Sequence, residues 1–220
     1  GCSFINFIIT LLLDATDMSV NFQEIDCRTT PMGLLSLRRR KSLVLDTEIY
    51  EIKLGEEFLM SSLFTVAEVA LANLGLFASP EFDVDVVVGG LGLGYTAKTV
   101  LEHSKVRELL VIDTLAEVID WHYQGLLPLS SLLTSDPRCR FIHGDFFAMS
   151  GSHFQGFDPN TRSRKFHAIL LDIDHSPTDL LHPRHAAFYE AEGLRQLAFH
   201  LRPEGIFALW SNDPPEERFQ

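Results

Sequence analysis

Residues 84–113 read VDVVVGGLGLGYTAKTVLEHSKVRELLVID, and this stretch decides the fold. The apolar run Val84–Val88 leads into a glycine cluster, and a helical pattern follows over Tyr95–His103. A second apolar run, Leu109–Ile112, ends on Asp113. A strand, a tight turn, a helix and a second strand in this order are typical of the start of a parallel α/β sheet. We therefore predict an α/β fold with a doubly wound, mostly parallel, Rossmann-like sheet.

The glycines of this stretch are Gly89, Gly90, Gly92 and Gly94. A strand-to-helix turn of this kind needs residues that tolerate positive φ and let the backbone approach a ligand. In such folds an acidic residue at the end of the next strand accepts hydrogen bonds from both ribose hydroxyls of a nucleoside, and Asp113 has that place. We predict that the four glycines and Asp113 bind a nucleoside.

The spacing of the glycines indicates which nucleoside is bound. A dinucleotide fingerprint, G-x-G-x-x-G, needs a small third residue, but counted from Gly90 that position holds the bulky Tyr95. No Gly-Lys-Ser/Thr follows the glycines, which excludes a P-loop. The pattern that is present, G-x-G-x-G, is that of S-adenosylmethionine binders. We therefore expect S-adenosylmethionine or decarboxylated S-adenosylmethionine as the co-substrate.

The composition limits the classes of partner. The chain has 220 residues and a formal net charge of −12, which argues against nucleic acid as a partner because that needs a basic surface. The apolar run Phe4–Leu13 is too short to span a bilayer and lacks a basic flank, so no membrane segment is predicted. Cys2, Cys27 and Cys139 are odd in number and far apart, which fits a reducing compartment. These features favour a cytoplasmic protein.

Three segments are expected along the chain. Residues 1–19 read as a leader or an expression-derived segment, residues 20–55 as a small antiparallel β unit, and residues 56–220 as the nucleoside-binding α/β domain. The first helix of that domain is expected over Phe58–Leu76. The basic run Arg38–Lys41 is interpreted as a solvated edge strand that its charge keeps from pairing. The β unit is too small to bury its own apolar face, so we expect a homodimer.

Two further apolar runs also end on carboxylates. Cys139–His143 is followed by Gly144 and Asp145, and Phe166–Leu171 is followed by Asp172. Sheet ligands bind at the carboxyl ends of such strands, so we expect Asp145 and Asp172 to converge with the glycine turn. The chain ends soon after its fifth predicted strand, which predicts a sheet that is truncated or reduced at the C-terminus. The later helices are expected over Ala116–Leu132 and Phe188–His200.

The order and spacing of these segments resemble the polyamine aminopropyltransferases, the spermidine synthase family, within the class I S-adenosylmethionine-dependent methyltransferase fold. The resemblance rests on VVVGGLGLG, LLVID, DPRCRFIHGDFFAM, FHAILLDIDHSP and FYEAEGLRQLAFHLRPEGIF. It implies that Asp113 holds the ribose, that Asp145 accepts a hydrogen bond from the adenine amine, and that Asp172 is the catalytic acid–base residue. The implied reaction is transfer of an aminopropyl group from a sulfonium donor to a small-molecule amine.

Three motifs depart from that family's pattern. The acid of the family's glycine loop falls at Leu93, the second acid of its D-S-S-D-P motif falls at His175, and its Tyr-Gln pair falls at Met60 and Ser61. These losses remove groups that would bind an elongated dication, so the amine acceptor and the form of the donor stay open. His175 is a second candidate catalytic residue, because an imidazole exchanges protons near neutral pH.

Two alternative functions stay open as well. The same scaffold supports an S-adenosylmethionine-dependent methyltransferase, and it also supports a non-catalytic nucleoside-binding or assembly protein; retention of Asp172 favours an enzyme. The acidic and histidine side chains after it have irregular spacing that prolines interrupt, so no metal site is predicted. These side chains are Asp174, His175, His182 and His185.

Overall fold

A computed structural model describes residues 22–79 and 81–212 of the chain. The chain divides into two compact units, Gly1–Phe64 and Thr65–Gln220. The predicted leader, residues 1–19, lies outside the described residues.

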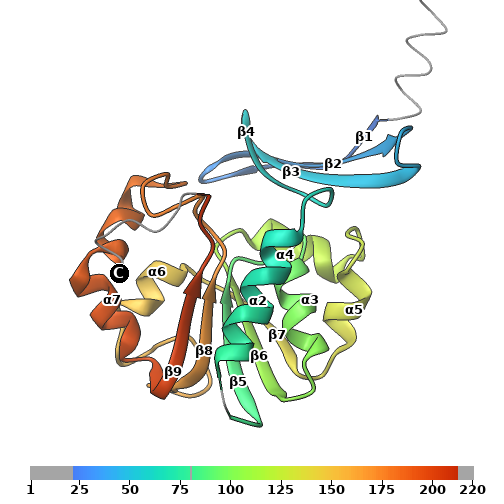
Figure 1. Cartoon of the computed structure of the whole chain (residues 1–220). Helices are drawn as coiled ribbons and strands as arrows, with labels where there is room; N and C mark the ends of the chain where they lie inside the picture. The colour runs from blue at the N-terminus through green and yellow to red at the C-terminus, as the bar shows by residue number, and fades with distance from the viewer. Residues whose placement is uncertain (1–21, 80, 213–220) are drawn as a thin grey trace, which may run out of the picture. The chain divides into compact units, whose positions relative to one another are not determined.

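The described part of the first unit is an antiparallel sheet in which neighbours in sequence are neighbours in space (Figure 1). Its strands are β1 (Phe22–Thr30), β2 (Gly33–Ser42), β3 (Thr47–Leu54) and β4 (Glu57–Ser61). Leu35 and Leu37 alternate along β2 and lie opposite Leu54 and Ile52 of β3. Because side chains alternate between the two faces of a strand, these four residues form one apolar face. The predicted antiparallel β unit is therefore present.

The structure corrects the interpretation of the basic run Arg38–Lys41. This run lies on β2, which is not an edge strand, because β1 and β3 pair with it on either side. Arg40 Nε lies 2.8 Å from Glu51 Oε1 on β3, and Lys41 Nζ lies 2.8 Å from Asp46 Oδ1 in the turn that follows. Opposite charges on adjacent strands favour pairing, so the basic run joins the sheet instead of protecting an edge.

The boundary between the units also differs from the predicted one. Residues 57–61 form β4, whereas a helix was expected to begin at Phe58, and α2 covers only Val66–Ala78. Gly55, with a φ of +59°, turns the chain back so that residues 57–61 pair with β3. This hairpin pairing overrides the helical pattern of the residues themselves. The α/β unit consequently starts at Thr65.

The second unit is a doubly wound α/β domain. Within its described residues the parallel strands follow the order β7-β6-β5-β8-β9. They are β5 (Val84–Gly89), β6 (Val106–Asp113), β7 (Cys139–His143), β8 (Phe166–Leu171) and β9 (Leu201–Leu209). β5 is the first of them in the chain and lies at the centre, so the winding reverses there. A ligand crevice is expected at the carboxyl end of β5 for this reason. The predicted Rossmann-like fold is confirmed.

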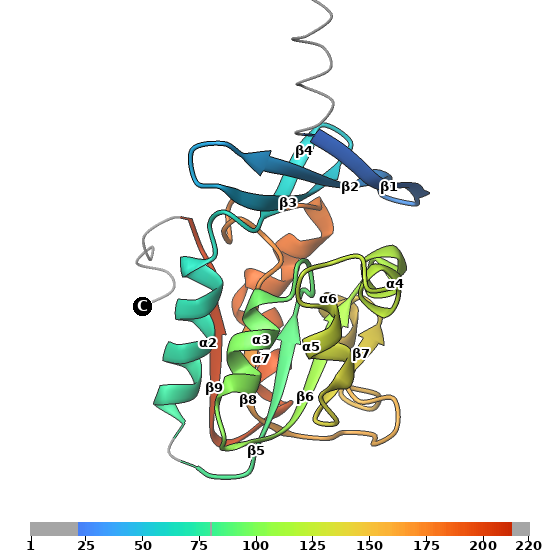
Figure 2. The ribbon, with the colours of Figure 1, turned by 90° about the vertical axis from the view of Figure 1, so that its right-hand side faces the viewer.

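Helices cover both faces of this sheet (Figure 2). α2 and α3 (Tyr95–Glu102) lie on one face, and α6 (Phe146–Ser150) and α7 (Ala191–Ala198) lie on the other. Every residue of β5 and β8 is buried, as expected of strands that are covered on both sides. None of the helices within the described residues is long and apolar enough to cross a membrane.

Two of the predicted helices are interrupted. The stretch Ala116–Leu132 contains α4 (Ala116–Tyr123) and the start of α5 (Ser130–Ser135). Between them lie Gly125, with a φ of +75°, and Pro128, both of which disfavour a continuous helix. The stretch Phe188–His200 contains the end of a 3₁₀ turn, η1 (Pro183–Tyr189), and α7. Glu190 is extended, with a ψ of 159°, and separates the two.

Candidate functional site

The glycine turn joins β5 to α3 with its backbone in the left-handed region. The φ angles of Gly90, Gly92 and Gly94 are +97°, +46° and +93°. A Cβ atom on Gly90 would lie 2.1 Å from the backbone oxygen of Asp172, a distance that no side chain can occupy. Gly90 is therefore required both by its conformation and by the close approach of the end of β8.

Gly89 and Gly94 have packing reasons for lacking a side chain. A Cβ atom on Gly89 would lie 2.6 Å from a ring carbon of Phe146, and one on Gly94 would lie 2.5 Å from Cδ1 of Leu133. Helices α6 and α5 can therefore pack close to the turn. For these two glycines a role in ligand binding stays a prediction, since packing by itself explains their identity.

Asp113 ends β6 and connects it to the glycine turn. Its Oδ2 accepts a hydrogen bond of 2.9 Å from the backbone N–H of Leu91, and its Oδ1 accepts one of 2.8 Å from that of Leu115. Burial raises the pKa of Asp113, while these N–H groups and that of Gly92 oppose the rise. The carboxylate thus fixes the turn, and the three N–H groups leave acceptor capacity for a further donor.

Asp145 caps the short helix α6. Its Oδ1 accepts hydrogen bonds of 2.9 Å and 3.2 Å from the backbone N–H groups of Phe147 and Ala148. Among the described residues, no group donates to Oδ2, and the side chain is exposed. An exposed acceptor oxygen held by a helix cap suits the predicted contact with an adenine amine.

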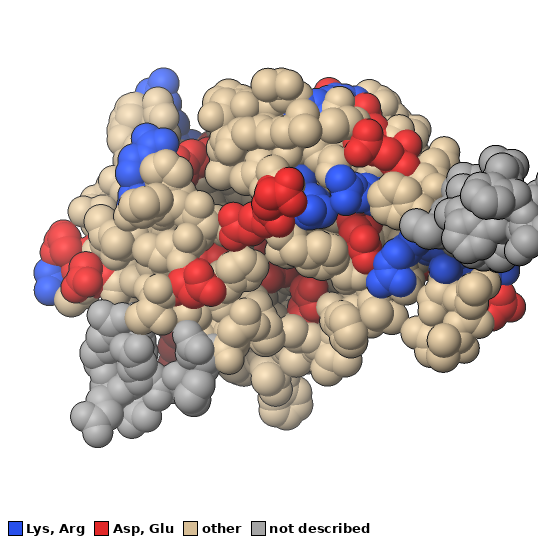
Figure 3. Space-filling view, turned by 90° about the horizontal axis from the view of Figure 1, so that it is seen from above, with Lys and Arg blue, Asp and Glu red and all other residues tan. Residues whose placement is uncertain are grey.

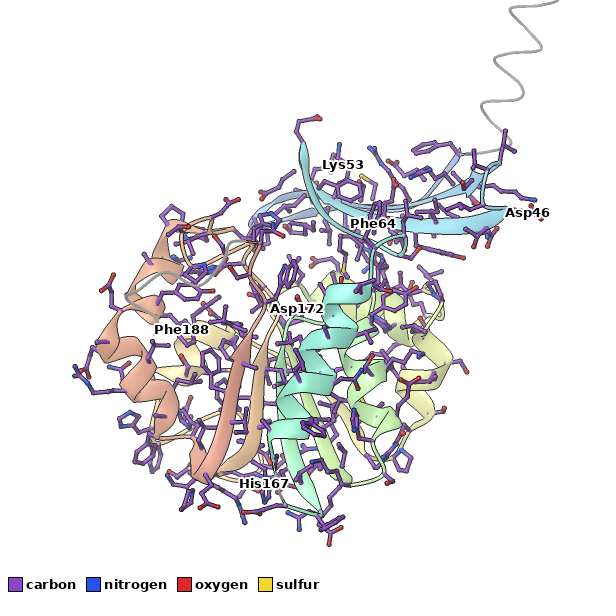
Figure 4. All side chains as sticks on the ribbon, in the orientation of Figure 1. Asp46, Lys53, Phe64, His167, Asp172 and Phe188 are labelled. Carbon is purple, nitrogen blue, oxygen red and sulfur yellow. The ribbon has the colours of Figure 1, made fainter. Side chains whose placement is uncertain are left out.

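Asp172 follows the last residue of β8, at the same end of the sheet as the glycine turn (Figure 4). Its backbone N–H donates to the Gly89 oxygen at 2.8 Å, and its Oδ2 accepts a hydrogen bond of 2.7 Å from Thr96 Oγ1. Burial raises the pKa of Asp172 to about 6; the bond from Thr96 opposes this rise and the nearby charge of Glu68 adds to it. A carboxylate with such a pKa can take up and release a proton near neutral pH.

The segment after Asp172 is anchored by Asp174. This carboxylate is buried and accepts hydrogen bonds from Leu181 N at 2.8 Å, from His185 Nδ1 at 2.8 Å and from the Tyr189 hydroxyl at 2.9 Å. Asp174 therefore holds the segment in place and is not directed at a ligand. His175 is partly buried, and its backbone oxygen accepts from Asn212 N at 2.8 Å. The catalytic role of His175 stays a prediction.

In the resemblance described above, the acid of the family's glycine loop falls at Leu93. In the structure, Leu93 is fully buried, with 0% of its side chain exposed. The side chain at this position packs inside the second unit and does not line an open crevice. The form of the donor is therefore not decided by the side chain of Leu93.

Two buried side chains beside the turn were not identified from the sequence. Thr96 contacts Asp172, and His122 of α4 lies 2.9 Å, through Nε2, from the backbone oxygen of Gly92. Burial lowers the pKa of His122 to about 4, against the effect of the Gly92 contact, so the ring is neutral and Nε2 donates. Thr96 could have been noticed in the sequence, because it is a polar residue at the start of the helix that follows the glycine turn. Nothing local in the sequence points from His122 to Gly92.

The chain has a similar sequence among curated proteins. The chain is 28% identical over 129 residues to polyamine aminopropyltransferase 2 of Pseudomonas aeruginosa, a match that covers 57% of this chain and 32% of that protein. The chain thus spans about a third of the length of this curated relative. No family model matches the chain.

Two solved structures of similar fold are spermidine synthases. A spermidine synthase in complex with the transition state analogue AdoDATO and the spermidine synthase of Thermotoga maritima both have a TM-score of 0.63 and 18% identity. Each match covers 84% of this chain, and 57% and 56% of the two solved chains respectively. At this identity the likeness establishes the fold. Together with the sequence match, it confirms that this chain resembles the polyamine aminopropyltransferases and has the α/β fold of the spermidine synthases.

Proposed function

We propose that the protein is a transferase that moves an aminopropyl group from decarboxylated S-adenosylmethionine to a small-molecule amine. The observation that carries this proposal is the grouping of the glycine turn, Asp113 and Asp172 at the carboxyl ends of β5, β6 and β8. The sequence relative is called a polyamine aminopropyltransferase, and a spermidine synthase of similar fold was solved with a transition state analogue. Both support this choice of donor and reaction.

The reaction needs a neutral amine in line with the carbon attached to sulfur. The amine nitrogen forms a bond to that carbon, the carbon–sulfur bond breaks, and its electron pair stays on sulfur, which leaves as the thioether of methylthioadenosine. The new ammonium group is acidic and gives up a proton. Asp172 would orient the attacking amine and accept this proton, a role that its pKa of about 6 suits.

The nucleoside would bind along the neighbouring strand ends. Asp113 would accept from the ribose with the acceptor capacity that its backbone donors leave free, and Asp145 would accept from the adenine amine. Replacing Asp113 by Ala should weaken methylthioadenosine binding by roughly 1.5–3 kcal/mol, as expected for lost hydrogen bonds to a charged group. Calorimetry measures this, and unchanged affinity in a folded variant would remove Asp113 from the site.

The decisive experiment is a turnover assay with decarboxylated S-adenosylmethionine and a panel of mono-, di- and triamines. Mass spectrometry detects methylthioadenosine and the aminopropylated product. Asp172→Asn should lower turnover by about 100-fold or more, because proton removal contributes on this scale, while nucleoside binding stays within a factor of about two. Asp179→Asn is the matched control, since Asp179 is exposed. Full turnover in Asp172→Asn would show that Asp172 is not the base.

Methyl transfer from S-adenosylmethionine is the second candidate. The loop Gly89–Gly94 contains no carboxylate, so it offers no repulsion toward the carboxylate of intact S-adenosylmethionine. Titrating both donors against the same preparation tests this point. We expect affinities within about tenfold, or ~1.4 kcal/mol. A hundredfold preference for S-adenosylmethionine would favour methyl transfer, and binding without turnover on any amine would favour a non-catalytic protein.

We further propose that the protein is a cytoplasmic homodimer with a small-molecule amine, and not nucleic acid, as its partner. On the face drawn in Figure 3, the Lys and Arg groups of the described residues lie among Asp and Glu groups. Cys27 and Cys139 are free thiols, which fits a reducing compartment. Light scattering at micromolar concentration tests the dimer, and a monomer there would contradict it.

A further inference from the structure

Thr96 makes an unusual hydrogen bond for a threonine inside a helix. Helical threonines commonly donate to a backbone oxygen of the preceding turn, and Thr99 of the same helix does so, to Tyr95 O at 2.9 Å. Thr96 instead donates across to Oδ2 of Asp172, at 2.7 Å. The two threonines are equally buried, at 3% and 2% exposure, so they differ in hydrogen-bond partner and not in environment.

The other contacts of Asp172 fix its main chain but not its carboxylate. Its N–H donates to Gly89, and its backbone oxygen packs directly against Gly90. Among the described residues, Thr96 alone donates to the carboxylate, and no donor reaches Oδ1. One oxygen is thus held by α3 and the other is left for a ligand.

The charges around Asp172 do not stabilise its ionised form. Glu68 of α2 is the charged side chain that acts on it, and this carboxylate has a buried Oε2 with no hydrogen-bond partner in the structure. Within the described part of the chain, no Lys, Arg or His pairs with Asp172. Burial and Glu68 therefore both disfavour the anion, and the hydroxyl of Thr96 is the group that opposes them.

We propose that Thr96 is a positioning residue for Asp172: its hydroxyl holds Oδ2 so that Oδ1 faces the attacking amine, and this hydrogen bond favours the ionised carboxylate. This inference rests on the proposed function for the role of Asp172 in turnover. The contact between Thr96 and Asp172, and its effect on the charge of Asp172, do not depend on that function.

Three variants test the proposal. Thr96→Val removes the hydroxyl at similar volume, Thr96→Ser keeps it, and Thr99→Val removes the matched hydroxyl that bonds within α3. The protonation of Asp172 is followed by carbon NMR in protein labelled at aspartate carboxyl carbons, with Asp172→Asn to assign the signal. Thr96→Ala is the second hydroxyl-free variant, in case Val does not fit the site.

The Asp172 signal should titrate roughly one pH unit higher in Thr96→Val, since a hydrogen bond to an ion is lost. Thr96→Ser and Thr99→Val should titrate like the wild type. In the turnover assay the acidic limb of the pH profile should move up by the same amount in Thr96→Val, with methylthioadenosine affinity unchanged. An unshifted signal in Thr96→Val or Thr96→Ala would overturn the proposal, as would an equal shift in Thr99→Val. If the Asp172 signal shifts in Thr96→Val but the wild-type protein turns over none of the amines, the contact is upheld and the proposed function is rejected.

Discussion

The carboxylates at the two ends of the parallel strands are held in different ways. We call these ends of the sheet its amino-terminal edge and its carboxyl edge. Near the amino-terminal edge, Asp85, Glu108 and Asp158 share Arg164, whose nitrogens lie 3.2 Å, 2.6 Å and 2.7 Å from them. Burial opposes ionisation of these three groups, but arginine bonds prevail and lower the pKa of each. At the carboxyl edge, Asp113 accepts from backbone N–H groups and Asp172 from the Thr96 hydroxyl; within the described residues neither pairs with an arginine, and burial raises both pKa values.

This difference separates structural carboxylates from those available to a ligand. A buried carboxylate that already has an arginine partner gains little from a cationic ligand, whereas one without a cation is poorly stabilised until such a ligand binds. Figure 4 shows the two ends of the sheet: His167, whose Nδ1 accepts a hydrogen bond of 2.9 Å from Asp85 N, is labelled near one end and Asp172 near the other. The carboxyl edge is therefore where the proposed function places the sulfonium donor and the amine.

Removing Arg164, which the three carboxylates share, should lower the free energy of unfolding more than the other variants do. Arg164→Met removes the arginine that joins the three carboxylates, while Arg107 still pairs with Asp85 and Arg140 with Glu108 and Asp158. A hydrogen bond to a charged group contributes about 1.5–3 kcal/mol, and Arg164 makes more than one, so the variant should lose roughly 3 kcal/mol of unfolding free energy. Because these carboxylates have lowered pKa values, their contribution is present above their unfolded pKa of about 4 and is lost as the pH falls through the folded values. Urea denaturation at neutral pH and at about pH 3 should show the deficit shrinking in acid.

Arg162→Met is the control for this variant. Arg162 is exposed and lies 4.6 Å from the ring centroid of Phe154. Its removal should cost less than about 1 kcal/mol. Equal losses in the two variants would mean that the arginine–carboxylate cluster does not stabilise the fold.

At the carboxyl edge, removing a charge should stabilise the protein. The pKa of Asp172 is about 6, against an ordinary value of 3.8, so the folded state favours the protonated form. The stability this provides is complete below pH 3.8 and is lost as the pH rises through about 6. Asp172→Asn should therefore gain roughly 1–3 kcal/mol relative to the wild type between about pH 4 and pH 7.5, while it loses turnover. Denaturation curves of both proteins at the two pH values measure this gain, and parallel pH dependence would argue against it.

Replacing Asp145, an exposed carboxylate at the carboxyl edge, should have the smallest effect on stability. Its carboxylate is exposed and caps α6 through Oδ1. Asp145→Ala should cost about 1 kcal/mol, the usual value of a helix cap, and Asp145→Asn should retain most of it. Thermal unfolding compares the two variants. Methylthioadenosine affinity should fall in Asp145→Ala, and an affinity equal to the wild type would exclude Asp145 from the adenine contact.

The local parts of the fold could be predicted because their signals are local. The runs Val84–Val88 and Phe166–Leu171 are buried strands, and Gly90, Gly92 and Gly94 have the positive φ that the turn requires. Asp113 is at the end of its strand, as its spacing from the glycines indicated. Apolar runs, glycine spacing and strand-end acids depend on neighbours in the chain, so a single sequence contains them.

The errors concern features that depend on strand pairing. Residues 57–61 form a strand through hairpin pairing with β3. Arg38–Lys41 lies inside the sheet, where its charges face Glu24 of β1 and Glu48 and Glu51 of β3. The burial of Leu93, where the acid of the resembling family falls, was not foreseen either. The periodicity of each segment taken alone does not show which strands will pair with it.

By itself, the sequence determined the type of sheet, the glycine turn and the carboxylates that end its strands. The tertiary structure alone decided how those carboxylates are held. Thr96 and Asp172 are 76 positions apart in the chain, and Arg164 and Glu108 are 56 apart, yet each pair is in hydrogen-bond contact. The charge state of a buried carboxylate depends on its burial and on the donors within a few ångströms, and the fold brings those donors together from distant segments.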